Sequence, residues 1–188
     1  MAVDPEVMRA LEQGGAVLNG HFQLNSGRHS DRYLEKFNLL QWPQHTELVC
    51  RKMADAGRAY SPRTVAGPTT GGVILAYEVG RQLGLRGIFC ERDPEGGRSF
   101  QRDFHLEPGE SVMVVDDVMT SGESVFDTIE AVKKAGGRVT SVAVMVDRSG
   151  GRVDFGDVPF FAATEVEMQT WTPEDCPLCK QGVPLKIT

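Results

Sequence analysis

The sequence predicts an α/β fold in which a mostly parallel central sheet is flanked by helices. Short runs rich in β-branched and apolar residues lie near Arg63, Gly87, Ser111 and Arg138, and helical patterns or a polar loop separate them. The run at 112–115 is apolar at every position, as in a strand that is buried on both faces. This alternation is typical of a parallel sheet with helices on both sides.

Length and composition favour a single domain. The 188 residues, 40% of them hydrophobic, are enough for one full core. We expect one domain over 1–188, with a core at about 41–165 and a small hood formed by about 1–40 and the C-terminal tail. A net charge of −6 argues against a general nucleic-acid binder, and no apolar run could span a membrane. With no signal-peptide pattern, we expect a cytoplasmic protein without disulfides.

Further elements follow from local signals. Asp4 and Pro5 form a helix start, as the N-cap and the first helical residue. Apolar periodicity predicts helices over 43–60 and 73–83, and the remainder of the chain at 159–168 reads as a strand. These elements complete the predicted alternation.

Polar residues follow the central apolar run in an order that has a chemical meaning. Asp116 and Asp117 come first, and Thr-Ser-Gly-Glu-Ser at 120–124 turns into a helix. A helix N-terminus favours a phosphate, hydroxyl groups add donors, and a glycine lets the backbone come close. Two carboxylates would repel a bare phosphate, but they suit a phosphate carried on a ribose. The residues assigned to this ribose 5-phosphate site are Asp116, Asp117, Thr120, Ser121, Gly122, Glu123 and Ser124. The alternative is an ordinary strand-turn-helix with a serine N-cap.

The same stretch resembles the signature of the type I phosphoribosyltransferases, which binds phosphoribosyl pyrophosphate (PRPP). The resemblance covers about residues 17–150 and implies the type I phosphoribosyltransferase fold. It also implies that Asp116 and Asp117 bind the ribose hydroxyls and that 120–124 binds the 5′-phosphate.

Residues 20–33 resemble the hood segment of one branch of this superfamily, the orotate phosphoribosyltransferases. The matching pattern is Gly-x-Phe-x-Leu-x-Ser-Gly-x-x-Ser-x-x-Tyr. The resemblance implies that Tyr33 and Leu34 lie against the pyrimidine ring and that Ser26, Gly27 and Arg28 form the adjoining turn. By itself, the segment could be an amphipathic hairpin, and Tyr33 could simply pack in the core.

Two further loops fit the same resemblance. The glycine-rich turn at 67–72 opens a helix, which makes it an anion site in principle or merely a tight turn. The resemblance implies a pyrophosphate loop that includes Thr70 and Gly71. Many family members carry a lysine near the position of Gly71, so the charge that this loop contributes stays open.

The polar stretch at 91–110 is long for a compact domain, which indicates a functional or disordered loop. The family has a flexible catalytic loop here that often reaches into the neighbouring subunit of a dimer. We assign Arg98, Arg102 and His105 to catalysis and Arg92 to substrate binding, as cations that close over the diphosphate. The usual loop lysines are missing, and a solvated hairpin is the alternative.

Arg148 follows the strand predicted at 138–146. A residue at the carboxyl end of a strand faces the ligand crevice in open α/β sheets. The resemblance implies that Arg148 holds the carboxylate of orotate, which suits the two-pronged guanidinium. The alternative is a loop arginine paired with Asp147.

The tail contains Cys176 and Cys179 in a Cys-x-x-Cys pattern. Structural zinc requires four ligands, and no second pair lies nearby in sequence. Cys50 and Cys90 fall in a predicted helix and strand, a site shared by two chains of a dimer lacks support, and a thioredoxin-like role needs a different context. The meaning of the tail stays open, and we expect no metal ligand among the protein side chains.

The resemblance implies transfer of ribose 5-phosphate from PRPP to orotate, giving orotidine 5′-monophosphate and pyrophosphate, in pyrimidine biosynthesis. Mg²⁺ is expected on the diphosphate, held largely by substrate oxygens and water. The expected partners are these small molecules and a second copy of the chain, with no nucleic acid or membrane. Two alternatives stay open: transfer to a purine base, and a non-catalytic regulator that senses PRPP.

Overall fold

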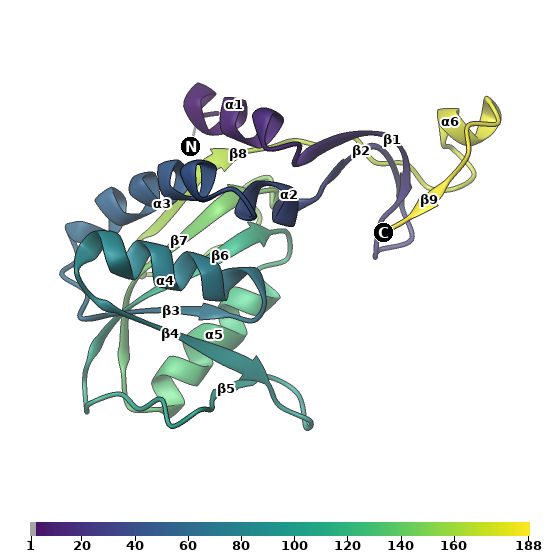
Figure 1. The fold of residues 1–188 in the computed structure, drawn as a ribbon. Coiled ribbons are helices and arrows are strands. Elements are labelled where there is room, and N and C mark those ends of the chain that lie inside the picture. The colour runs from purple at the N-terminus through teal and green to yellow at the C-terminus, as the bar shows by residue number, and fades with distance from the viewer. Residues whose placement is uncertain (1–2) are drawn as a thin grey trace.

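In the computed structural model, which describes residues 3–188, the chain forms a larger and a smaller sheet (Figure 1). The strands of the larger sheet are β3 (Thr64–Pro68), β4 (Arg86–Arg92), β5 (Arg98–Phe100), β6 (Ser111–Met119), β7 (Arg138–Asp147) and β8 (Phe160–Glu165). Their order is β5-β4-β3-β6-β7-β8, and all neighbours are parallel except β5, which runs antiparallel to β4. The predicted α/β fold with a mostly parallel sheet is confirmed.

Helices cover both faces of the larger sheet. Met113 and Val115 of β6 pack in one core cluster with α3 (Pro43–Arg58) and α4 (Gly71–Leu83). Val112 and Val114 point the opposite way and pack with α5 (Glu123–Lys134). Because successive side chains of a strand alternate between faces, the continuous apolar run of β6 serves both clusters.

The smaller sheet has the order β2-β1-β9 and is called the hood sheet below. It comprises β1 (Val17–Gln23), β2 (His29–Leu34) and β9 (Lys186–Ile187), and the short helix α6 (Pro177–Lys180) lies in the same tail as β9. β1 pairs antiparallel with β2 and parallel with β9, so the two ends of the chain meet there. Figure 1 shows the hood sheet on the side toward which β3 and β6 point.

The two short N-terminal helices pack against the helices that cover the larger sheet. In α1 (Pro5–Gln13), the buried side chains of Val7 and Leu11 join the core cluster of α3 and α4. The Asp4 side chain accepts hydrogen bonds from the N–H groups of Glu6 and Val7, as expected for an N-cap. The structure therefore places α1 on the core, whereas the expected hood included it. α2 (Lys36–Leu40) also contacts α3 and α4.

Two local features differ in detail from the expected elements. β6 continues through Asp116 and Asp117 to Met119, so the acidic pair (Asp116 and Asp117) lies within the strand and not after it. The first part of the polar stretch is a hairpin, since Arg92 of β4 pairs with Arg98 of β5. No helix within residues 3–188 is long and apolar enough to cross a membrane.

Candidate functional site

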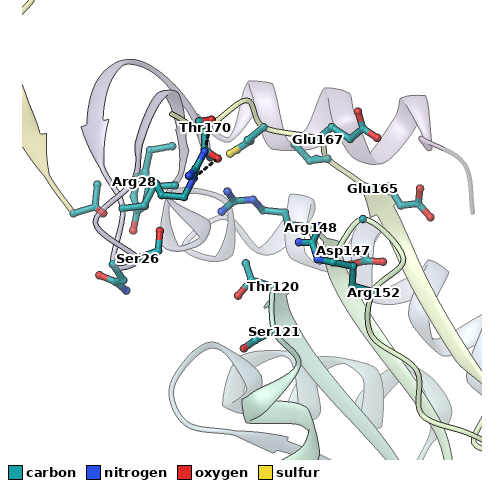
Figure 2. A pocket seen from close by; sticks show the side chains of 17 residues that line it. Ser26, Arg28, Thr120, Ser121, Asp147, Arg148, Arg152, Glu165, Glu167 and Thr170 are labelled. Atoms are coloured by element: carbon teal, nitrogen blue, oxygen red, sulfur yellow. Dashed lines mark hydrogen bonds between the residues drawn. The ribbon is translucent and has the colours of Figure 1, made fainter. Parts of the chain in front are cut away.

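A cavity of about 850 Å³ separates the hood sheet from the carboxyl edge of the larger sheet (Figure 2). Its lining residues are Leu24, Asn25, Ser26, Arg28 and Tyr33 near the hood sheet, Thr120, Ser121, Asp147, Arg148, Gly150 and Arg152 at the sheet edge, and Glu165, Val166, Glu167, Met168, Thr170 and Thr188 from later segments. The cavity thus brings together Arg148, residues of the predicted turn in the hood segment at 26–28 (the hood turn) and residues of the predicted phosphate-binding turn at 120–124 (the phosphate turn). A volume of this size is typical of small-molecule sites.

The phosphate turn lies between β6 and α5. Gly122 has a φ of +81°, a conformation that glycine adopts without strain, and α5 begins at the next residue. The first turn of α5, whose N–H groups have no acceptor within the helix, therefore follows directly on Thr120 and Ser121. This geometry supports an anion at the end of the cavity that these two residues line.

Asp116 is held by its neighbours. The Ser124 hydroxyl donates to its carboxylate, and the backbone N–H of Asp117 donates to Oδ1 over 2.8 Å. Burial, reinforced by the adjacent Asp117, raises the pKa of Asp116 from 3.8 to about 6. Asp116 is therefore a fixed hydrogen-bonding group that still titrates below neutral pH.

Asp117 has a partner that the sequence did not reveal. The Lys36 ammonium lies 3.0 Å from each carboxylate oxygen of Asp117, and this pair joins the start of α2 to the end of β6. The Asp117 side chain is 7% exposed, so the pair is only weakly screened by water. Sequence reasoning missed Lys36 because a pairing across 81 positions has no local pattern.

The glycine-rich turn is packed against the acidic pair. A Cβ atom on Gly71 would lie 2.0 Å from Asp117 Oδ2, and one on Gly72 would lie 2.6 Å from the Pro68 ring. Because Asp117 is fixed by Lys36, a lysine at position 71 does not fit without displacing it. The structure thus gives a steric reason for a glycine at position 71.

The four cations of the predicted catalytic loop lie in different surroundings. Arg98 is buried, and its Nη1 donates to Thr69 Oγ1 over 3.2 Å, beside Thr70 in the glycine-rich turn. Its Nε has no hydrogen-bond partner within residues 3–188. Arg102 is exposed and makes two hydrogen bonds to Glu91, of 2.9 and 3.0 Å.

His105 is exposed, with Nδ1 3.3 Å from the Asp103 carbonyl oxygen, and Arg92 is an exposed residue at the end of β4. The structure therefore brings Arg98 to the glycine-rich turn, whereas the side chains of Arg102 and His105 contact the polar stretch itself. The catalytic and binding roles of these four residues stay predictions.

Arg148 extends into the cavity between Thr120 and Thr170 (Figure 2). Its side chain is half-buried, and across the described residues its Nε has no partner. Desolvation lowers the pKa of Arg148, while the nearby Tyr33 opposes this effect. The Asp147 carboxylate accepts from the Ser149 N–H over 2.6 Å, and no Arg148–Asp147 ion pair is found in the described chain. A half-buried guanidinium with free donors favours an anionic ligand.

Arg28 connects the hood turn to the segment that follows β8. Its guanidinium donates to Thr170 Oγ1 over 2.9 Å and to the Thr170 carbonyl oxygen over 2.8 Å. His29 and Trp171 exchange two backbone hydrogen bonds of 2.9 Å just beyond. Thr170 was not among the predicted site residues, although the cavity and this contact both involve it.

The comparisons with known proteins agree with this geometry. The phosphoribosyl transferase domain family matches residues 37–174. The chain is 49% identical to an orotate phosphoribosyltransferase of Heliobacterium modesticaldum over 95% of this chain and 94% of that protein. It is 45% identical to one of Thermotoga maritima over 95% and 94%. The solved orotate phosphoribosyltransferase of Aeropyrum pernix superposes with a TM-score of 0.74 at 27% identity, covering 85% of this chain and 93% of that one.

Fold, site and matches together define a phosphoribosyltransferase of type I. Within that class, the chain belongs to the orotate phosphoribosyltransferase family.

Proposed function

We propose that this enzyme transfers ribose 5-phosphate from PRPP to orotate, as a step of pyrimidine nucleotide synthesis. The observation that carries the proposal is Arg148, a half-buried guanidinium whose Nε has no partner in residues 3–188 and which faces the cavity near Tyr33. Orotate is a flat pyrimidine with a carboxylate. The Tyr33 ring suits its face, and the fork of Arg148 suits its carboxylate.

The ribose 5-phosphate end of PRPP would occupy the phosphate turn. Thr120, Ser121 and the first N–H groups of α5 would bind the 5′-phosphate. The acidic pair would accept hydrogen bonds from the ribose hydroxyls, with Asp116 oriented by Ser124. This arrangement fixes the sugar while leaving its C1 atom exposed to the base.

The reaction needs no protein nucleophile. The C1–O bond to the diphosphate breaks with its electron pair leaving on oxygen. A ring nitrogen of orotate supplies the pair for the new C1–N bond and gives up its proton to the leaving diphosphate or to water. The sugar becomes oxocarbenium-like in between, so the enzyme contributes alignment and charge stabilisation.

On the diphosphate side, we assign Thr70, Gly71, Arg98 and Lys36. The glycine-rich turn offers backbone N–H groups, and Arg98 lies directly beside it through Thr69. Lys36 supplies a positive charge next to the turn. Asp117 leaves no room for a lysine side chain at position 71 of the turn itself. Arg92, Arg102 and His105 would approach only on closure of the polar stretch.

Mg²⁺ fits this site as an ion held by the substrate. The acidic pair is engaged by Ser124 and Lys36, so its carboxylates do not form a separate protein cage. Diphosphate oxygens and water provide the remaining ligands that Mg²⁺ prefers. When bound, the ion supplies charge stabilisation for the leaving diphosphate.

We also propose a homodimer in the cytoplasm. Large apolar side chains are exposed on α2, on α4 and at the residue that caps the start of α3, and these three helices contact one another. Tyr77 is the most exposed of them at 70%. These residues are Phe37, Trp42, Ile74 and Tyr77. An exposed apolar surface of this kind supports association. Cys50, Cys90, Cys176 and Cys179 form no disulfide, which suits a reducing compartment.

The test is pyrophosphate release from PRPP and Mg²⁺ with orotate, uracil, adenine, guanine or xanthine in separate reactions. We expect turnover with orotate and little with uracil, which lacks the carboxylate. Turnover with a purine would contradict the assignment of the base site. Binding of PRPP without turnover of any base would contradict the enzymatic function and favour a regulator that senses PRPP.

A further inference from the structure

Two histidines of the hood sheet and two cysteines of the tail form a cluster. His21 lies on β1 and His29 begins β2, whereas Cys176 precedes α6 and Cys179 lies in it. One nitrogen or sulfur atom of each of these residues lies within 4.8 Å of the others. The proposed reaction uses none of them, and none lines the cavity.

The spacing of these atoms is close to that of a tetrahedral metal site, although the two histidine nitrogens lie nearer to each other than zinc would hold them. His21 Nε2 lies 3.0 Å from His29 Nδ1 and 3.4 Å from Cys176 Sγ. Cys179 Sγ lies 3.3 Å from His29 Nδ1 and 3.7 Å from His21 Nε2. A tetrahedral Zn²⁺ with bonds of about 2.0–2.3 Å holds its ligand atoms roughly 3.3–3.8 Å apart.

A hydrogen bond to a residue outside the cluster orients His21 for metal binding. His21 Nδ1 lies 2.8 Å from the Val183 carbonyl oxygen, which can only accept a hydrogen bond. The Nδ1–H group therefore donates to Val183 and leaves the lone pair of Nε2 directed at the cluster. Metal-binding histidines are generally held in this way by a carbonyl or carboxylate on the far nitrogen.

The surroundings favour a closed structural site. His21, His29 and Cys176 are buried, and only Cys179 is exposed. Four protein ligands leave no open position for a water or substrate, which distinguishes structural from catalytic zinc. Two thiolates and two neutral imidazoles also select zinc over the hard cations that prefer oxygen.

We propose that His21, His29, Cys176 and Cys179 bind one structural Zn²⁺ per chain. Binding displaces the two thiol protons into solvent, and the resulting thiolates balance the charge of the ion. This proposal differs from the expectation of no metal ligand among the protein side chains. Sequence reasoning considered only a second cysteine pair, whereas the missing ligands are histidines of a hairpin some 150 residues earlier.

The ion would fasten the C-terminal tail to the hood sheet. Between the cluster and the chain end, β9 pairs with β1, and Thr188 lines the cavity. Before the cluster, Trp171 pairs with His29 of β2, and Thr170 accepts a hydrogen bond from Arg28. Zinc therefore stabilises the wall of the cavity that is proposed to cover the base, without taking part in the transfer.

The experiment measures metal in the full chain after purification without chelator, by elemental analysis. We expect about one zinc per chain, released on acidification or by a thiol-modifying reagent. The double variant Cys176→Ser/Cys179→Ser should lose the zinc. The matched variant Cys90→Ser changes a cysteine outside the cluster and should keep it, as should His45→Gln.

A second measurement does not depend on variants. Wild-type protein stripped of metal and given Co²⁺ should show thiolate-to-cobalt charge transfer and the visible bands of tetrahedral cobalt. Zinc binding should also raise the midpoint of thermal unfolding. The proposal is overturned if wild-type protein neither contains nor takes up zinc, if the double cysteine variant retains it, or if thiol titration finds a Cys176–Cys179 disulfide in protein kept under reductant.

Discussion

The Lys36 ammonium lies 3.0 Å from both carboxylate oxygens of Asp117, so the start of α2 is bound to the end of the central strand. Asp117 in turn occupies the space beside Gly71, which leaves no room for a side chain there. These contacts place a lysine, a carboxylate and the glycine-rich turn together. A lysine of another element therefore lies beside the glycine-rich turn, with Asp117 between them.

Lys36→Met should weaken PRPP binding and lower kcat. Without the ammonium, the carboxylate of Asp117 repels the diphosphate and is left buried without a counter-ion, which we expect to cost about 10²-fold in kcat/KM. Calorimetric titration with PRPP and steady-state kinetics measure both effects. The control is Lys52→Met, which removes a lysine that pairs with Asp4 and Glu6 on the surface. Equal PRPP affinity in wild type and Lys36→Met would remove Lys36 from the site.

Asp117→Asn should reduce activity by about 10²–10³-fold while the protein stays folded, because the change keeps the shape but removes a charged acceptor. Circular dichroism checks that the variant is folded, and pyrophosphate release measures its activity. Glu130→Gln on the exposed side of α5 is the matched control. Unchanged activity of Asp117→Asn would contradict the role of the acidic pair.

Asp116 should make the stability of the protein depend on pH. Its pKa is raised from 3.8 to about 6 in the folded state, so the folded protein binds the proton more tightly than the unfolded chain. The free energy of unfolding therefore falls as pH rises from about 4 to about 6, by roughly 2–3 kcal/mol from this group.

Urea unfolding at several pH values measures this dependence, and Asp116→Asn should flatten it. If wild type and Asp116→Asn show the same slope between pH 4 and 6, the raised pKa does not belong to Asp116. The variant should also lose activity, because an amide cannot replace the carboxylate that Ser124 orients.

Tyr77→Glu should dissociate the proposed homodimer. Tyr77 is 70% exposed on α4, so a charge there costs little in the monomer but is buried in an apolar interface. Sedimentation velocity should show a dimer for wild type and a monomer for the variant. Tyr60→Glu, at a residue just beyond α3 that is 44% exposed, is the control and should leave the dimer intact. A wild-type monomer at micromolar concentration would contradict the proposal.

The sequence predicted those parts of the fold that local patterns determine. The apolar run at 112–115 appears as the centre of β6, and the Asp4–Pro5 start of α1 is confirmed by the N-cap hydrogen bonds. The phosphate turn and Arg148 were also placed at the correct edge, because the ends of parallel strands meet there. These features depend on residues that are close together in the chain.

Features that depend on tertiary contacts could not be predicted in this way. Lys36 reaches Asp117 across the fold, and His21 joins Cys176 through the pairing of the two chain ends. In the hairpin of β4 and β5, Arg98 is buried beside Thr69, which a charged residue in a polar stretch does not suggest. In each case, a side chain acquires its role from an element far away in sequence.

The most direct test of the proposed function compares orotate with uracil in wild type and in Arg148→Leu. The two bases differ in the carboxylate that Arg148 is proposed to bind. We predict that wild type prefers orotate in kcat/KM by at least about 10³-fold and that Arg148→Leu loses most of this preference, with the KM for PRPP nearly unchanged. A variant that retains the wild-type preference for orotate would contradict the assignment of Arg148 and, with it, the proposed position of the base.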